Sequence, residues 1–203
     1  MVYIDKRGVL EGPSESYPTI VELGCGNRKA IEDSLGVDLL DSPCVDIVGD
    51  AVDVLRMFPP GSLKEIHAYH FIEHVDDVDE LLEVIARTLE PGGVFICVAP
   101  HFSNPYFYSD PTHKTFFGLY TFCYWTESTL FKRTTPAYKP VINLVLTSVD
   151  LIFRDSRPFY VNYAVKRVFG GLMNSTRGTR EFYERWLTGF LSCYEVLYKV
   201  TKS

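Results

Sequence analysis

Short apolar runs alternate with stretches of helical spacing through the first hundred residues. Five of these runs predict strands: Thr19–Leu23, Leu35–Leu40, Val45–Asp50, Glu65–Tyr69 and Val94–Ala99. The spacing also predicts a short helix over Arg28–Ser34 and a longer one over Asp76–Leu89, which the glycines after Pro91 should end. Such alternation predicts an α/β architecture with a parallel sheet and right-handed crossovers.

Aromatic residues dominate the pattern after Pro100. Six Phe and six Tyr or Trp fall within residues 101–138, with turn residues between them. We interpret residues 101–140 as an insertion that caps the carboxyl edge of the sheet. The remaining pattern predicts a strand over Val141–Phe153, helices over Tyr163–Met173 and Arg180–Leu191, and a last, alternating strand over Tyr194–Thr201.

Composition narrows the classes of protein to consider. A chain of 203 residues suits one domain, and a net charge of −6 argues against a nucleic-acid partner. The apolar stretch at Val141–Phe153 is shorter than the ~20 residues of a membrane span. Residues 1–12 lack the apolar core of a signal peptide. The five cysteines are widely spread, which is typical of a reducing compartment, so we expect a cytoplasmic protein.

The first predicted strand ends in the turn Gly24-Cys25-Gly26. In an open α/β sheet, ligands bind outside the carboxyl ends of strands, and glycines let the backbone approach them closely. A dinucleotide fingerprint requires a third glycine where this chain has Lys29, and the P-loop pattern is absent. S-adenosylmethionine has no phosphates to bind. Three acids are spaced for its amino-acid, ribose and adenine parts: Glu22, Asp38 and Asp50.

Several motifs together resemble those of a known family. Val21–Gly26 resembles the first motif of the class I S-adenosylmethionine-dependent methyltransferases, and Gly36–Asp38 and Gly49–Ala51 resemble the second and third. Three later segments are similar to the E-H-V, L-x-P-G-G and V-x-P pattern of the group that includes the ubiquinone-pathway O-methyltransferases: Phe71–Val75, Leu89–Gly93 and Val98–Pro100. The match covers residues 17–100.

The resemblance implies a Rossmann-like, doubly wound sheet of seven strands with an antiparallel last strand. It divides a single domain, residues 1–203, into a cofactor-binding half at 17–100, the insertion at 101–140 and C-terminal strands and helices at 141–203. It implies S-adenosylmethionine as cofactor, bound by Glu22, Gly24, Cys25, Gly26, Asn27, Asp38, Leu39, Asp50, Ala51, Tyr69 and His70. The short interval between Asp38 and Asp50 predicts that the helix usual at this place is missing or reduced to a turn.

The implied activity is methyl transfer to an O or N nucleophile of a small-molecule or biosynthetic-intermediate acceptor. Deprotonating such an acceptor requires a base, and His101 and His113 are the candidates. The alternative is that these histidines are hydrogen-bonded residues that hold the insertion in place. The aromatic residues around them could line an acceptor pocket, although packing is the expected role for most.

A second group of residues suggests a metal site. His70, Glu73 and His74 would share one face of a helix, and His101 or His113 could complete a zinc or manganese site. Relatives with an E-x-x-E-H arrangement bind metal, but here His70 replaces the first glutamate. The alternative is a helix-terminal acid and a pocket-lining imidazole without a metal.

Two further functions remain open from the sequence. The chain could bind S-adenosylmethionine or S-adenosylhomocysteine without turnover, as a module or subunit. A dinucleotide oxidoreductase is disfavoured by Lys29. The aromatic C-terminal half offers a surface for oligomerisation.

Overall fold

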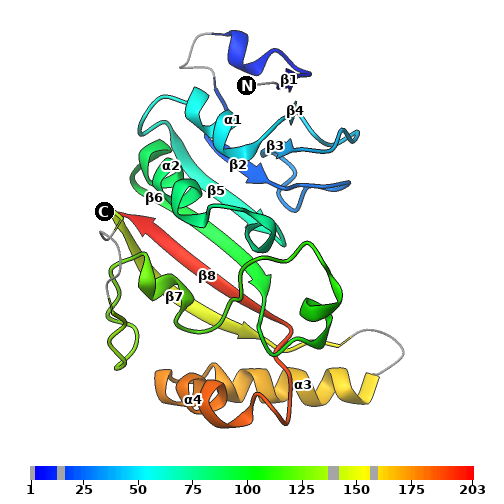
Figure 1. The fold of residues 1–203 in the computed structure, drawn as a ribbon, viewed down its shortest axis with the longest axis vertical. Helices are drawn as coiled ribbons and strands as arrows, with labels where there is room; N and C mark the ends of the chain where they lie inside the picture. The colour runs from blue at the N-terminus through cyan, green and yellow to red at the C-terminus, as the bar shows by residue number, and fades with distance from the viewer. Residues whose placement is uncertain (1–2, 13–16, 137–141, 156–159) are drawn as a thin grey trace.

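An eight-stranded sheet runs through the molecule (Figure 1). The computed structural model describes residues 3–12, 17–136, 142–155 and 160–203. The strands are β1 (Ile4–Asp5), β2 (Ile20–Leu23), β3 (Leu35–Asp38), β4 (Ile47–Val48), β5 (Leu63–Tyr69), β6 (Leu89–Pro100), β7 (Leu144–Ile152) and β8 (Glu195–Lys202). Their order across the sheet is β1-β4-β3-β2-β5-β6-β8-β7.

The strand order reverses at β2. This strand pairs in parallel with β3 on one side and with β5 on the other, so that Val21 lies between Leu35 and Ile66. In α/β sheets a crevice for ligands opens at the carboxyl ends of the strands where the order reverses. The glycine turn that follows β2 is therefore at the position where a ligand is expected.

Two helices lie side by side near this half of the sheet, α1 (Ala51–Met57) and α2 (Val78–Thr88) (Figure 1). Each begins at an aspartate that caps its first turn: Asp50 accepts hydrogen bonds from the backbone of α1, and Asp77 from that of α2. The apolar face of α2 is buried, as its sequence spacing predicts.

The C-terminal helices lie beyond the other edge of the sheet (Figure 1). These are α3 (Tyr160–Met173) and α4 (Arg177–Phe182), and a π-helical turn at Tyr183–Leu187 follows α4. The ring of Phe153, just after β7, packs edge-on against Phe169 and Tyr183. Short 3-10 turns occur at Val9–Glu11, Ile72–His74, Pro105–Ser109 and Thr121–Tyr124.

Part of the aromatic segment belongs to the core. Phe122 is fully buried, with its ring 4.3 Å from that of Tyr198 on β8 and 6.2 Å from that of Phe95 on β6. Phe117 is also fully buried, whereas Tyr106 and Phe116 are exposed. The segment therefore covers one face of the sheet with some of its rings and leaves others in solvent.

Most of the sequence-based expectations for the fold are confirmed. Each of the five predicted strands of the first half forms, at least in part, and the last strand, β8, is antiparallel to β6. No helix forms between β3 and β4. The strand predicted over Val141–Phe153 is β7, although residue 141 lies outside the described residues. The eighth strand, β1, is a two-residue addition at the sheet edge, antiparallel to β4.

The helix predicted over Asp76–Leu89 also forms as α2 and ends at Thr88, and the glycines after Pro91 lie within β6. Three other expectations for the elements are wrong. Residues 28–34 form turns instead of a helix, because the Glu22 carboxylate binds their backbone. The helix predicted over Arg180–Leu191 begins at Arg177 and changes to a π-helical turn at Tyr183. The 3-10 turn at Ile72–His74 replaces the helix expected around Glu73.

None of the helices in the described parts of the chain combines the length and the apolar character needed to cross a bilayer.

Candidate active site

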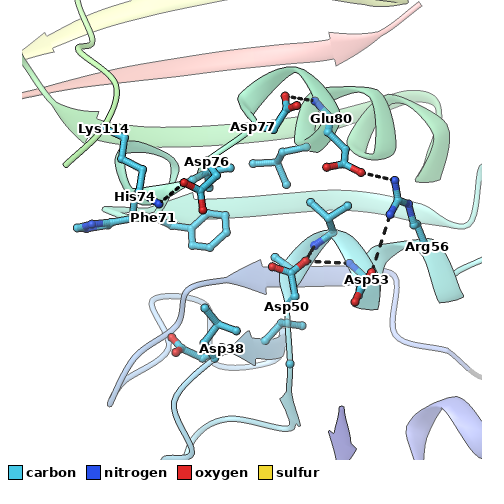
Figure 2. A pocket seen from close by; sticks show the side chains of 17 residues that line it. Asp38, Asp50, Asp53, Arg56, Phe71, His74, Asp76, Asp77, Glu80 and Lys114 are labelled. Atoms are coloured by element: carbon cyan, nitrogen blue, oxygen red, sulfur yellow. Dashed lines mark hydrogen bonds and ion pairs between the residues drawn. The ribbon is translucent and has the colours of Figure 1, made fainter. Parts of the chain in front are cut away.

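A cavity of about 330 Å³ opens at the carboxyl ends of β3 and β4. Asp38 and Asp50 approach it from these two strands, and Phe71, His74 and Lys114 from the opposite side (Figure 2). The start of α1 and the segment leading into α2 complete its lining. The position is the one that the strand order predicts for a ligand.

The glycine turn beside the cavity depends on positive backbone φ angles. Gly24 has φ +66° and Gly26 has φ +57°. A Cβ atom on Gly24 would lie 2.6 Å from the ring of Phe71, so a side chain there would displace a residue that lines the cavity. A Cβ atom on Gly26 would meet nothing within 4 Å, so the backbone at Gly26 is open to close approach.

Asp38 connects the glycine turn to the end of β3. Its Oδ2 accepts a hydrogen bond from the backbone N–H of Gly26 at 2.8 Å, and its Oδ1 accepts one from Leu40 at 2.8 Å. Each carboxylate oxygen has two lone pairs, so both keep the capacity to accept a ligand hydroxyl.

Asp50 has capacity for a ligand as well. As the N-cap of α1, its Oδ1 accepts from the backbone of Val52 at 2.9 Å and of Asp53 at 3.1 Å. Both bonds end on the same oxygen, which leaves Oδ2 as an acceptor at the cavity wall.

Glu22 lies beneath the loop rather than in the cavity lining. Its buried carboxylate accepts from the backbone N–H groups of Ala30 and Ile31, both at 2.9 Å, and from the Ser34 hydroxyl at 3.4 Å. These bonds hold the connection between β2 and β3 in place of a helix. Glu22 is thus a positioning residue for the glycine turn.

The other residues expected to bind the cofactor fall into two groups. Leu39 and Ala51 line the cavity. Outside its lining are the glycine turn, Gly24, Cys25 and Gly26, and the residues Asn27, Tyr69 and His70. Burial raises the pKa of the Cys25 thiol to about 12, which keeps it protonated and makes it a packing residue of the turn.

His70 is turned toward β8. Among the described residues it is the one non-glycine with positive φ, at 53°. Its Nε2 lies 2.7 Å from Oε1 of Glu195, which also pairs with Arg154, and its Nδ1 lies 3.4 Å from Oε1 of Glu73. The hydrogen bond that His70 donates to Glu195 and the nearby Glu73 carboxylate raise the pKa of His70 to about 9.

The structure places Glu73 and His74 next to His113 rather than on one helix face with His70. The backbone N–H of Lys114 donates to the carbonyl oxygen of Glu73 at 2.7 Å. This bond brings the rings of His74 and His113 to 4.8 Å between centroids. Glu73 is completely buried, and neither of its carboxylate oxygens has a hydrogen-bond partner.

His101 has a position that conflicts with its expected role as a base. It is completely buried, and its ring is bonded to the Ser103 hydroxyl at 2.8 Å and to Glu184 at 2.9 Å. Both ring nitrogens are thus occupied within the protein, which fits the alternative that His101 holds the insertion in place.

Several residues of the cavity were not predicted from the sequence, among them Phe71, Asp76 and Lys114. Phe71 lines it beside Gly24, and Asp76 and Lys114 form an ion pair of 2.6 Å at its edge (Figure 2). Phe71 and Lys114 are the sequence neighbours of His70 and His113. Their proximity to candidate residues was therefore a usable signal, but the Asp76–Lys114 pairing joins segments that no local pattern connects.

Comparison with known proteins finds a domain match and a shared fold. Residues 21–97 match the model of a methyltransferase domain. No match was found among curated protein sequences. A SAM-dependent methyltransferase from Archaeoglobus fulgidus has a similar structure, with 19% identity and a TM-score of 0.54 over 90% of this chain and 85% of that one. So does a putative methyltransferase from Haloferax volcanii, solved with the Trm112 activator, with 19% identity and a TM-score of 0.52 over 90% and 81%.

These likenesses in structure show the shared fold, and the domain match covers the turn, both cavity acids and the strands that carry them. The chain thus carries a match to a methyltransferase domain at residues 21–97 and shares the fold of S-adenosylmethionine-dependent methyltransferases.

Proposed function

We propose that the chain methylates an O or N nucleophile of a small-molecule or biosynthetic-intermediate acceptor, with S-adenosylmethionine held between the Gly24–Gly26 turn and α1. The observation that carries this proposal is the pair of carboxylates, Asp38 and Asp50, that line one cavity from adjacent strand ends. The noncatalytic module considered from the sequence is not favoured for a member of this enzyme class.

The residues present fit the cofactor. The cavity volume of about 330 Å³ lies within the range of small-molecule sites. Asp38 retains acceptor capacity for the ribose hydroxyls, and Asp50 Oδ2 for the adenine amino group. The open backbone at Gly26 leaves room for the amino-acid end of the cofactor.

When bound, S-adenosylmethionine supplies an electrophilic methyl group on a sulfonium. The protein's own task is to orient the acceptor and to exclude water, since displacement requires alignment of the nucleophile with the methyl group. Phe71, Val75 and Leu81 give the cavity an apolar wall for this purpose. His74 and Lys114 provide polar groups on the side opposite the acids (Figure 2), where we place the acceptor.

We also propose that the C-terminal half of the chain contacts another protein chain. Exposed apolar side chains gather on α3, α4 and the residues after them: Val165, Val168, Leu172, Phe182, Trp186 and Phe190. Their exposure supports the expectation that this half contacts another chain. A cytoplasmic location remains a prediction from the sequence.

Calorimetry with S-adenosylhomocysteine tests the cofactor site. We expect Asp38→Asn to weaken binding about 10- to 100-fold, because a hydrogen bond to a charged group contributes about 1.5–3 kcal/mol. Asp41→Asn is the matched control: Asp41 is an exposed acid on the same loop that pairs with Lys6 and does not line the cavity. Absence of binding by the unchanged chain, or equal binding by Asp38→Asn, would refute this site.

A further inference from the structure

We propose that Glu73, His74 and His113 bind a divalent transition-metal ion in the wall of the cofactor cavity. One ligand atom from each of these residues lies within 4.8 Å of the others. The site goes beyond the proposed function, because binding of the ion requires neither cofactor nor acceptor.

The first argument is the state of the Glu73 carboxylate. It is completely inaccessible to solvent, and neither oxygen accepts a hydrogen bond. His70 Nδ1 forms an ion pair of 3.4 Å with Oε1, whereas Oε2 has neither a hydrogen bond nor an ion pair among the described residues. Buried charges in proteins are paired or coordinate metals, so Oε2 is available to a second cation.

The second argument is that neither imidazole uses Nε2 in a hydrogen bond among the described residues, and that His113 Nε2 lies 3.8 Å from a further carboxylate oxygen, Oδ2 of Asp110. His113 Nδ1 lies 2.8 Å from the carbonyl oxygen of Phe107, which can only accept, so Nδ1 is the donor. The Thr112 hydroxyl donates to Asp110 at 2.6 Å, and it therefore accepts from Nδ1 of His74 at 2.8 Å. In the neutral form of each histidine, Nε2 is thus the ligand atom, with Nδ1 held by the kind of outer bond that orients metal-binding histidines.

The third argument is the way the fold holds the group together. Glu73 and His74 end the 3-10 turn after β5, and His113 comes from the aromatic segment 40 residues later. The Lys114–Glu73 backbone bond and the ring of Phe107, 4.6 Å from that of His113, fix their relative position. Metal–ligand bonds of about 2.0–2.2 Å require ligand atoms about 3–3.5 Å apart. Small side-chain rotations would supply the closure.

The ligand types indicate the class of ion. Two neutral imidazoles and one carboxylate suit zinc, manganese or ferrous iron rather than calcium or magnesium, which prefer oxygen ligands. Three protein ligands leave coordination positions open. Because His74 also lines the cavity, an open position there would meet an acceptor oxygen or nitrogen. Only this last step depends on the proposed function.

The test uses zinc as the probe on the full chain. Chelator-treated protein is mixed with zinc, separated from free ion by gel filtration, and measured for bound metal. We expect about one zinc per chain for the unchanged protein, and at least a tenfold loss for Glu73→Gln and His113→Gln. His67→Gln is the matched control, since His67 is buried in β5 with Glu65 and Tyr69 as partners and should keep its zinc.

Thermal unfolding of the unchanged chain supplies a second readout that does not depend on the variants folding. Zinc at about a hundredfold above its Kd should raise the Tm by about 5–10 °C. The proposal is overturned if the chain retains less than about a tenth of an ion and shows no Tm shift, or if His113→Gln binds as much zinc as the unchanged chain. If the zinc proposal fails in this way but the chain still binds S-adenosylhomocysteine, the proposed cofactor site stands independently of the metal site.

Discussion

At the scale of single residues, Gly24 and Gly26 differ although both have positive φ. A Cβ atom on Gly24 would collide with Phe71, whereas one on Gly26 would meet open space. We expect Gly24→Ala to lower the free energy of unfolding by about 2–5 kcal/mol, from backbone strain and overpacking together, and Gly26→Ala by only about 1–2 kcal/mol. Urea unfolding of the two variants measures the difference. Equal losses would show that Phe71 does not constrain the turn.

A second prediction concerns Glu73 in the absence of metal. Because its buried carboxylate accepts no hydrogen bond and has only the 3.4 Å ion pair with His70, we expect its desolvation to outweigh that pair, so Glu73→Gln should raise the free energy of unfolding of chelator-treated protein by about 1–2 kcal/mol. The exposed Glu32→Gln serves as control and should change it by less than about 0.5 kcal/mol. Thermal or urea unfolding with excess chelator gives both values. A destabilised Glu73→Gln would mean that the carboxylate is already satisfied in the metal-free protein.

At the scale of elements, the connection between β2 and β3 is held by buried acids instead of a helix. The Asp46 carboxylate forms ion pairs with Lys29 and, at 3.1 Å, with Arg7. It also accepts a hydrogen bond from the backbone N–H of Gly36 at 2.8 Å. Burial by itself would raise the pKa of Asp46, but these donors lower it below its ordinary value of 3.8.

This arrangement predicts a dependence of stability on pH. Since the folded-state pKa of Asp46 is lowered, its contribution is present above the unfolded pKa and is lost as pH falls through the folded value. Asp46→Asn should cost about 3 kcal/mol at pH 7 and progressively less as the pH falls below 3.8, because the unchanged chain loses the same interaction as Asp46 is protonated. Unfolding measured at pH 7 and at a series of pH values below 3.8 tests this. A cost that does not change with pH would contradict it.

The aromatic segment mixes core and surface rings, and a pair of substitutions separates them. Phe122→Ala should lower the free energy of unfolding by about 3–5 kcal/mol, because its ring is buried between Phe95 and Tyr198. Phe116→Ala, which truncates a ring that is 55% exposed, should cost less than about 1 kcal/mol. Similar losses in urea unfolding would mean that the segment is not divided in this way.

At the scale of the whole molecule, the sheet was predictable because β-branched runs and glycine turns are local signals. The failures have non-local causes. The helix expected over residues 28–34 gave way to hydrogen bonds that the backbone of these residues donates to Glu22 in the preceding strand. The helix α1 was not predicted, and Asp50, expected to bind the cofactor, is also its cap.

The candidate site likewise contains residues that local sequence signals revealed and residues that contacts between distant segments bring in. Asp38 and Asp50 follow strands, and the sequence pattern was enough to predict them as cavity residues. The proposed metal ligands Glu73, His74 and His113 were all among the sequence candidates, but His70 was grouped with them because helical spacing was assumed there. The chain instead has a left-handed residue at His70 and then a single 3-10 turn. Spacing could not choose between His101 and His113, because a backbone bond between distant segments brings His113 to Glu73.

The most direct test of the account is a crystal structure of the chain with S-adenosylhomocysteine. We predict electron density for the nucleoside in the cavity between β3 and α1, with the ribose hydroxyls within hydrogen-bond distance of Asp38 and the adenine beside Asp50. Density for the nucleoside at another place on the sheet, with this cavity empty, would contradict the account.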